Sequence, residues 1–275
     1  MAVGQYKIGA IIQARLGSTR LPNKVLMPLP INSKNTIISH AINQLKKISQ
    51  ISKIIVATST SIVNNKLEKY VLDLDIDCYR GDENDVLSRF YNIVEQNDFD
   101  YVLRLTGDNP VIDNDYLIEF IENCIAKELD YSCSKNLPIG CNFEIIKTGE
   151  LIKAHKHATC LYDKEHVTPY IRKNAKNISY YNFETYKKGY NLRLTIDYPT
   201  DYAFMQIVFS KLKNELITLE KVNEIVAKDL WILDINKDNY QKLENATLQE
   251  EIQTILPIIK ERDLNKLLKF LEDVN

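Results

Sequence analysis

The stretch IIQARLGSTRLPNKVL, from Ile11 to Leu26, joins an apolar run to a short segment that carries three cations. The apolar run predicts a buried β-strand. Arg15, Arg20 and Lys24 follow it, together with a glycine and two hydroxyl side chains. A turn that only reverses the chain needs glycine or proline and has no use for three positive charges. The segment is therefore either an anion-binding loop or a solvated basic turn after an edge strand, and its residue types favour the first interpretation.

Phosphate binding explains the composition of this loop. Gly17 lets the backbone approach a ligand closely, and Ser18 and Thr19 supply hydroxyl donors. The two arginines can each donate paired hydrogen bonds to phosphate oxygens, while the lysine acts as a point charge. The pattern GxxxxGK[ST] is absent, so this is not a Walker loop.

Strand-like and helix-like segments alternate through the first half of the chain. The expected strands are 7–14, 53–58, 77–82 and 101–108, and the expected helices are 36–48, 62–74 and 85–97. Such alternation predicts right-handed βαβ crossovers and a largely parallel sheet. Binding sites in these sheets lie at the carboxyl ends of the strands, where the cationic loop and Asp108 fall.

After about residue 130 the pattern changes. Further strands are expected at 131–135, 141–146, 179–185 and 192–197, with helices near 149–157 and 164–173. We interpret this part as a mixed edge of the same sheet, and the chain from Pro199 onward as mostly helical. We therefore expect a catalytic domain over residues 1–212 and a helical C-terminal extension over residues 213–275 that packs on the same domain.

Two aspartates end apolar runs that are far apart in the chain. Asp108 follows the run in RLTGDNPVID, and Asp197 follows the run in LRLTIDYPTDY. Each can be a helix or turn cap. Two carboxylates at one sheet edge would instead suit Mg²⁺, which takes one or two carboxylates together with phosphate oxygens and water.

Bulk properties restrict the class of protein. The 275 residues carry a formal net charge of −2, which argues against general binding to nucleic acid or to anionic membranes. The five cysteines are scattered without a CxxC pair, as in reduced cytosolic proteins. No apolar run approaches the roughly 18 residues of a membrane helix, and the N-terminal run is too short for a signal peptide. We expect a cytoplasmic protein.

Five segments, taken in order, resemble the signature segments of the SpsF-like cytidylyltransferases, which are similar in turn to CMP-Kdo and CMP–sialic acid synthetases. The segments are IIQARLGSTRLPNKVL, RGDENDVLSRF, VLRLTGDNPVID, EHVTPYIR and LRLTIDYPTDY. The resemblance implies an α/β fold of the nucleotide-diphospho-sugar-transferase type (Rossmann-like, GT-A type), a three-layer sandwich with a mostly parallel, seven-stranded sheet and a helical C-terminal tail.

The same resemblance assigns expected roles to individual residues. Arg15, Lys24 and Asp108 would be catalytic, and Asp108 and Asp197 would hold Mg²⁺. The nucleotide would be bound by Gln13, Ala14, Arg15, Gly17, Ser18, Thr19, Arg20, Lys24, Thr58, Arg80, Gly81, Asp82, Thr106 and Gly107. The acceptor would lie near Gly140, Asn142 and Glu144. Independently of the resemblance, the residue types of KEHVTPYIRK make His166 and Arg172 candidate contacts for an anionic acceptor.

The sequence departs from the family pattern at two positions. Asn23 stands where the family usually has glycine, and Asn142 stands where an aspartate is expected near the acceptor. The second departure affects the identity of the acceptor and not the nucleotide. His166 can act as a base or can be hydrogen-bonded inside the fold.

These observations predict a Mg²⁺-dependent nucleotidyltransferase that uses a nucleoside triphosphate, with CTP favoured, and a small sugar-like acceptor. The expected reaction activates the acceptor for polysaccharide or glycan synthesis and releases pyrophosphate. The alternatives are a glycosyltransferase of the same fold that consumes a nucleotide sugar, and a non-catalytic nucleotide-binding protein. A homodimer is compatible with the resemblance.

Overall fold

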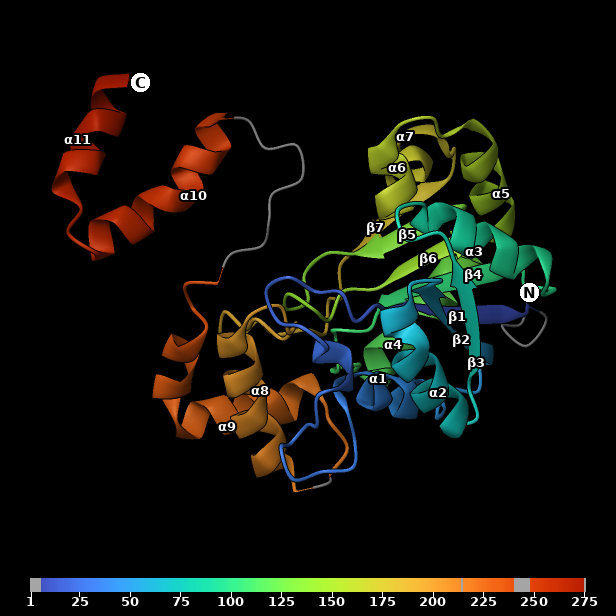
Figure 1. The fold of residues 1–275 in the computed structure, drawn as a ribbon, viewed down its shortest axis with the longest axis horizontal. Coiled ribbons are helices and arrows are strands. Elements are labelled where there is room, and N and C mark those ends of the chain that lie inside the picture. The colour runs from blue at the N-terminus through green and yellow to red at the C-terminus, as the bar shows by residue number, and fades with distance from the viewer. Residues whose placement is uncertain (1–5, 214, 240–247, 275) are drawn as a thin grey trace.

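Strand β1 (Ile8–Gln13) lies between β2 and β4 in a seven-stranded sheet whose order is β3-β2-β1-β4-β6-β5-β7 (Figure 1). The computed structural model describes residues 6–213, 215–239 and 248–274. The other strands are β2 (Ile51–Ser59), β3 (Asp77–Gly81), β4 (Tyr101–Thr106), β5 (Tyr131–Ser134), β6 (Glu144–Lys147) and β7 (Ile178–Tyr181).

The sheet is mostly parallel. Strand β1 pairs in parallel with β2 and β4, β2 with β3, and β5 with β7, whereas β6 runs antiparallel to both of its neighbours. Gln13, at the end of β1, lies level with Ala57 of β2 and Thr106 of β4. The predicted parallel sheet with a mixed edge is therefore confirmed, and three carboxyl ends meet beside the cationic loop.

Helices cover both faces of this sheet (Figure 1). The helices of the described ranges are α1 (Ile37–Leu45), α2 (Asn65–Asp73), α3 (Val86–Glu95), α4 (Asn114–Ala126), α5 (Thr148–His157), α6 (Leu161–His166), α7 (Pro169–Asn174), α8 (Pro199–Leu212), α9 (Leu219–Lys228), α10 (Leu248–Glu261) and α11 (Asn265–Val274), with 3₁₀ turns η2 (Lys24–Leu26), η3 (Ile62–Asn64) and η4 (Leu230–Ile235). All of the helices but α10 and α11 belong to the part of the chain around the sheet.

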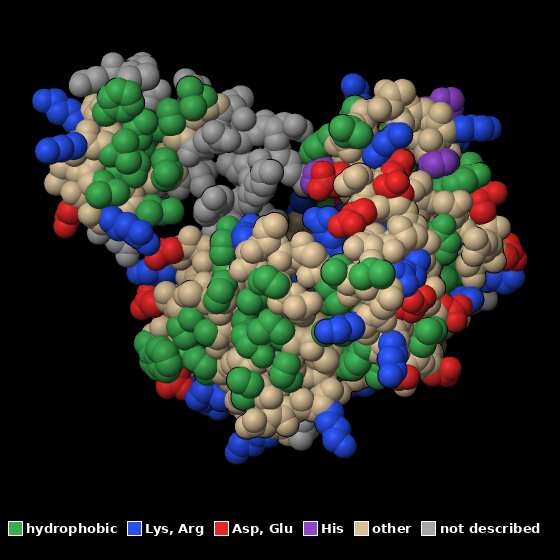
Figure 2. Space-filling view, viewed as in Figure 1, with side chains coloured by type: hydrophobic (Ala, Val, Ile, Leu, Met, Phe, Trp, Pro, Cys, Tyr) green, Lys and Arg blue, Asp and Glu red, His purple; other side chains and the backbone are tan. Residues whose placement is uncertain are grey.

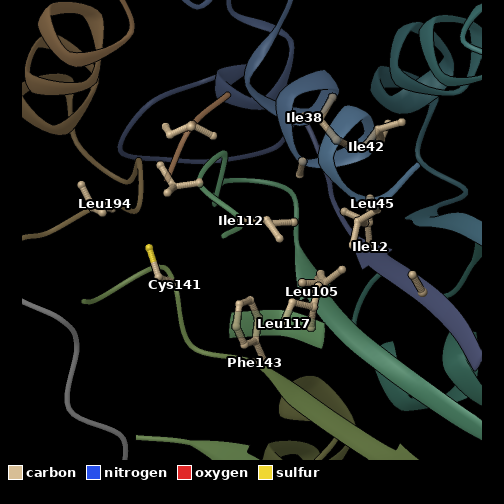
Figure 3. Close-up of a cluster of buried hydrophobic side chains, with 14 of the residues drawn as sticks. Ile12, Ile38, Ile42, Leu45, Leu105, Ile112, Leu117, Cys141, Phe143 and Leu194 are labelled. Atoms are coloured by element: carbon tan, nitrogen blue, oxygen red, sulfur yellow. The ribbon is translucent and has the colours of Figure 1, made fainter. Parts of the chain in front are cut away.

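Side chains of β1 alternate between two cores, as the two-residue period of a strand requires. Ile8, Ala10 and Ile12 pack into the core shared with α1, α2, α4, α8 and α9. Ile11 enters the core formed with α3 and α5 on the opposite face. Figure 3 shows Ile12 beside Leu45 of α1 in the first core. Both faces of the sheet are therefore covered, and this leaves its edges and strand ends for function.

The segment predicted as a strand at 192–197 is not one. It makes a single isolated bridge, between Arg193 and Ile139, instead of a ladder. Two backbone hydrogen bonds fix it, from Leu194 to Ile139 over 2.8 Å and from Ile196 to the carbonyl of Asp108 over 3.0 Å. The second bond places Asp197 next to Asp108 without a shared strand.

The helix predicted at 164–173 is interrupted. Val167 has a φ of 68°, and a new helix, α7, begins with Pro169 at its first position. Proline fits a first helical turn because its missing N–H has no partner there. The chain therefore forms two short helices, α6 and α7, in place of one.

The C-terminal part is helical, as predicted. Helix α9 and the turn η4 bury Val222, Val226 and Ile232 in the same core as α8. Helices α10 and α11 pack on each other, and Figure 1 draws them away from the sheet. Hydrophobic side chains gather on this pair in Figure 2, and the exposed ones are Leu248, Ile255, Leu264, Leu267 and Phe270. The domain boundary between residues 212 and 213 stays a prediction.

Across the described ranges, none of the helices has both the length and the apolar character that crossing a membrane would demand.

Candidate active site

A cavity of about 500 Å³ opens at the carboxyl edge of the sheet. Twelve of the predicted site residues line it, namely Gln13, Ala14, Arg15, Gly17, Ser18, Thr19, Arg20, Lys24, Thr106, Gly107, Asp108 and Asp197. Val25, Glu83, Asn84, Val86, Arg89, Leu161 and Glu165 complete its wall. The segments after β1 and β4 and the segment before α8 thus meet around one cavity.

The cationic loop is held at both of its ends. The Leu16 N–H donates to the Asn64 side chain over 2.9 Å, and the Asn23 N–H donates to the Leu16 carbonyl over 3.1 Å. Asn23 has a φ of 59°, in the left-handed region that glycine and asparagine tolerate best. This backbone explains why asparagine can stand where the family has glycine. It also directs the next residue, Lys24, into the turn η2 below the cavity.

Lys24 bridges the two predicted metal ligands. Its Nζ lies 2.7 Å from Asp108 Oδ2 and 2.9 Å from Asp197 Oδ1, and only 9% of its side chain is exposed. Burial opposes the charge on Lys24, but the two carboxylates outweigh burial and raise the pKa of the ammonium. Two aspartates that are 89 positions apart therefore converge on one cation.

Asp197 has further cationic partners. Burial favours its neutral form, but Lys24, Arg20 and Arg193 outweigh this effect and hold the pKa of the carboxyl below its usual value. The Arg20 guanidinium lies 3.3 Å from Asp197 and 4.8 Å from the ring centre of Tyr198. Asp197 is therefore ionised throughout the neutral range.

A buried network supports Asp197 from behind. Arg193 donates to Asp197 over 3.1 Å and to the fully buried Asp201 over 3.0 Å. Asn236, which follows η4, donates to Asp201 and to the Arg193 carbonyl, both over 3.1 Å. The C-terminal segment thus contributes to the position of a carboxylate in the cavity.

Arg89 is a cavity residue that the sequence prediction missed. It is 2% exposed and lines the cavity. Its Nε has no hydrogen-bond partner, and its one described bond runs 3.4 Å to the Ala57 carbonyl. Burial is the main reason that its pKa is lowered. A Cβ at Gly81 would lie 2.7 Å from Arg89 Cγ, so the glycine makes room for this side chain. The helical spacing of RGDENDVLSRF gave no sign that Arg89 faces the cavity.

Four predicted nucleotide-binding residues lie outside the cavity lining. Arg80 donates to Glu68 over 2.7 Å and to the Ser61 carbonyl over 3.0 Å, so it is tied to α2 and η3. Asp82 accepts from the backbone N–H groups of the loop before α3. Thr58 is fully buried and its hydroxyl has no partner. Gly81, the fourth, passes against Arg89.

None of the five predicted acceptor-binding residues lines the cavity. Gly140 has a φ of 93° and packs against the backbone of Thr195, and Asn142 bonds within its own loop, to Ser134 and Leu137. Glu144 pairs with Arg104. The other two lie on α6 and α7, where the His166 ring packs 4.6 Å from Tyr162 and Arg172 is partly buried. Their role as acceptor ligands stays a prediction.

The side chains that line the cavity are of the types that suit a polyanion and a divalent cation. Arg15, Arg20, Lys24 and Arg89 supply positive charge, and two carboxylates already share one cation. Two carboxylates are a fitting ligand set for Mg²⁺ when phosphate oxygens complete the shell. Within the described residues no group of three or more His, Cys, Asp or Glu gathers as a metal centre.

The sequence model of the cytidylyltransferase family matches residues 9–267. The chain belongs to the cytidylyltransferase family. A cytidylyltransferase is a nucleotidyltransferase, so this chain is an enzyme of that class.

Two curated relatives match most of this cytidylyltransferase. An uncharacterized protein of Methanocaldococcus jannaschii is 34% identical over 238 residues, which are 86% of this chain and 97% of the relative. The spore coat polysaccharide biosynthesis protein SpsF of Bacillus subtilis is 32% identical over 231 residues, which are 80% and 96%. The predicted resemblance to the SpsF-like family is confirmed.

A solved cytidylyltransferase from Leptospira borgpetersenii superposes on this cytidylyltransferase with a TM-score of 0.76 at 25% identity. The match covers 87% of this chain and all of the other. The predicted fold type is thereby confirmed as well. The family match favours nucleotidyl transfer over the alternative of a glycosyltransferase.

Proposed function

We propose that this enzyme transfers CMP from CTP to an oxygen of a small sugar-like acid or sugar phosphate, with Mg²⁺, and releases pyrophosphate. The convergence of Asp108, Asp197 and Lys24 beside a cavity lined by three arginines carries the proposal. The preference for CTP follows from the family. The acceptor class follows from the polysaccharide role named for SpsF and from the resemblance to CMP-Kdo and CMP–sialic acid synthetases.

The proposed reaction is an in-line displacement at the α-phosphorus. A bond forms between the acceptor oxygen and the α-phosphorus, the bond from that phosphorus to the bridging oxygen of the β-phosphate breaks, and the electron pair leaves with pyrophosphate. A sugar phosphate attacks through an oxygen that is already ionised and needs no general base. The hydroxyl of a sugar-like acid would instead pass its proton to water or to a carboxylate of the described cavity lining, which contains no histidine. Catalysis then depends on alignment and on stabilisation of the spreading charge.

Different residues of the chain bind the phosphates and the metal ion in this proposal. Arg15, Arg20 and Arg89 bind phosphate oxygens. The paired N–H donors of each guanidinium group fix the orientation of the phosphates. Asp108 and Asp197 would hold Mg²⁺, which neutralises charge on the phosphate oxygens when it is bound.

A coupled pyrophosphate assay tests the proposal. The protein is incubated with Mg²⁺, with each of CTP, UTP, GTP and ATP, and with a panel that contains an octulosonic acid, a nonulosonic acid and several sugar phosphates. We expect pyrophosphate with CTP and one acceptor class. Release of free nucleoside diphosphate from a nucleotide sugar, without pyrophosphate formation, would support the glycosyltransferase alternative and contradict the proposal.

A further inference from the structure

The two aspartates of the cavity each present one oxygen to the same point. Asp108 Oδ1 accepts from the Thr106 hydroxyl over 2.6 Å, and Asp197 Oδ2 accepts from Arg193 over 3.1 Å. Their other oxygens, Asp108 Oδ2 and Asp197 Oδ1, both contact Lys24 Nζ. One oxygen of each carboxylate is thus held by Thr106 or Arg193, and the other oxygen of each meets Lys24 Nζ. Arg20 also reaches Asp197 Oδ1, over 3.3 Å, but Lys24 is the cation that joins the two aspartates.

Lys24 occupies this position between the two aspartates because of its backbone. The left-handed Asn23 begins the turn η2, and Lys24 is the first residue of that turn. The aliphatic part of the Lys24 side chain is buried, so surrounding residues hold the ammonium group beside the carboxylates. The contact is therefore built into the loop and does not depend on a freely rotating surface lysine.

A dication and an ammonium cannot share this position. Magnesium needs carboxylate oxygens at about 2.1 Å, inside the space that the ammonium fills. If Lys24 moved away while the phosphate-binding part of the cavity held no anion, it would enter a region already lined by Arg15, Arg20 and Arg89. A bound triphosphate supplies negative charge in that region, so the displaced position of the Lys24 ammonium becomes favourable.

We propose that Lys24 is a built-in counter-ion that keeps the metal position closed until a nucleotide arrives and then moves from the two aspartates to the triphosphate. This inference rests on the proposed function, because it takes the aspartates as metal ligands. It makes metal binding and nucleotide binding strongly coupled, and such coupling is reciprocal.

Titration with Mn²⁺ in the absence of nucleotide tests the inference, with the free ion followed by electron paramagnetic resonance. We expect Lys24→Met to bind Mn²⁺ at least about 10-fold more tightly than the wild type, within the usual range of coupling factors. Lys24→Arg keeps the positive charge and should retain the weak binding of the wild type. Lys53→Met is the matched control, because Lys53 pairs with Asp77 over 2.6 Å, away from the cavity lining.

A second titration measures the coupling. With α,β-methylene-CTP present, Mn²⁺ affinity should rise at least about 10-fold in the wild type and much less in Lys24→Met. Circular dichroism and thermal melts establish that each variant is folded, and Asp108→Asn combined with Lys24→Met should lose the gain in affinity.

The outcomes separate the two proposals. Equal Mn²⁺ affinity of the wild type and folded Lys24→Met without nucleotide would overturn the counter-ion role and leave the proposed function standing. Absence of pyrophosphate release with every nucleotide would overturn the proposed function, while a gain in Mn²⁺ affinity in Lys24→Met would still support the counter-ion.

Discussion

Arg104 and Glu144 face each other across the antiparallel strands β4 and β6 and form an ion pair whose side chains are 17% and 16% exposed. Glu144 also accepts hydrogen bonds from the hydroxyls of Tyr131 and Thr168. Arg104 donates to Gln13, which lines the cavity, over 3.3 Å. The pair therefore joins the mixed edge of the sheet to the wall of the active site.

Replacing Glu144 by Gln should destabilise the fold and change its response to acid. Burial raises the pKa of Glu144, but Arg104 and the hydrogen bonds outweigh it and hold the pKa below the ordinary 4.5. The stabilisation is therefore complete above about pH 4.5 and is lost as the pH falls through the lower folded value. We expect Glu144→Gln to lose about 3 kcal/mol at pH 7, because Arg104 is left without its counter-ion.

Urea unfolding at pH 7, 4 and 3 measures this change. The free energy of unfolding of the wild type should fall at acid pH, and part of this fall should be missing in Glu144→Gln. Glu215→Gln removes an exposed ion pair with Lys221 and is the control, with little change expected. A pH dependence identical to that of the wild type would contradict the ionised state of Glu144.

Arg89→Met should weaken nucleotide binding by about 10- to 100-fold. Loss of one hydrogen bond to a charged group usually changes an affinity by about this factor. The same substitution removes a buried cation that lacks a carboxylate partner among the described residues, so the nucleotide-free fold should be as stable as the wild type or more stable. Isothermal titration with CTP and a thermal melt measure the two effects. Loss of stability with normal CTP affinity would show that Arg89 is a structural residue.

Asp108→Asn and Arg15→Ala should each lower kcat by at least about 100-fold, comparable to the removal of one group that stabilises transition-state charge. Asp77→Asn, at the amino end of β3, is the control for loss of a paired carboxylate and should keep normal turnover. Near-normal pyrophosphate release in either site variant would refute the assignment of these residues.

Asn236→Ala should affect the proposed metal position indirectly, through Asp201 and Arg193. Loss of its two hydrogen bonds leaves Asp201 and Arg193 less well held, and we expect a cost of about 1–3 kcal/mol in stability. The Mg²⁺ concentration for half-maximal rate should rise, while KM for the acceptor stays the same. A loss of stability without a change in Mg²⁺ dependence would limit Asn236 to a structural role.

Gly140→Ala should destabilise the protein by about 1–3 kcal/mol, because φ is 93° there and an added Cβ would lie 2.5 Å from the Thr195 nitrogen. Gly149→Ala is the matched control. Gly149 lies in α5 with open space around its Cβ position, and alanine favours a helix, so this variant should be as stable as the wild type or more stable. Equal effects of the two substitutions in a urea titration would contradict the predicted strain.

The parallel half of the sheet and the cationic loop could be predicted from the sequence alone. Strands β1 and β4 are apolar runs that end in polar residues, and α1 has apolar residues at helical spacing after the capping Thr36. These signals are local, so periodicity detects them. The meeting of Asp108 with Asp197 was also predicted, although Asp197 arrives on an extended segment and not on a strand.

The other features depend on contacts between residues far apart in the sequence, and hydrophobic periodicity gives no information about such contacts. Whether 192–197 joins a ladder is decided by its neighbours, Ile139 and Asp108, and not by its own β-propensity. Arg89 looks like an ordinary charged position on an amphipathic helix until Gly81 is seen to make room for it. Three of the five predicted acceptor residues, Gly140, Asn142 and Glu144, were carried over from a family motif, and in this chain they are occupied by packing or by internal bonds.

The reversal of strand β6 decides on which side of the sheet the chain between β5 and β6 lies. Because β5 ends and β6 begins at the same edge, their connection, residues 135–143, belongs to the carboxyl side of the sheet together with the loop after β1. The hairpin therefore lies on the same side of the sheet as the basic turn, although none of residues 135–143 lines the cavity.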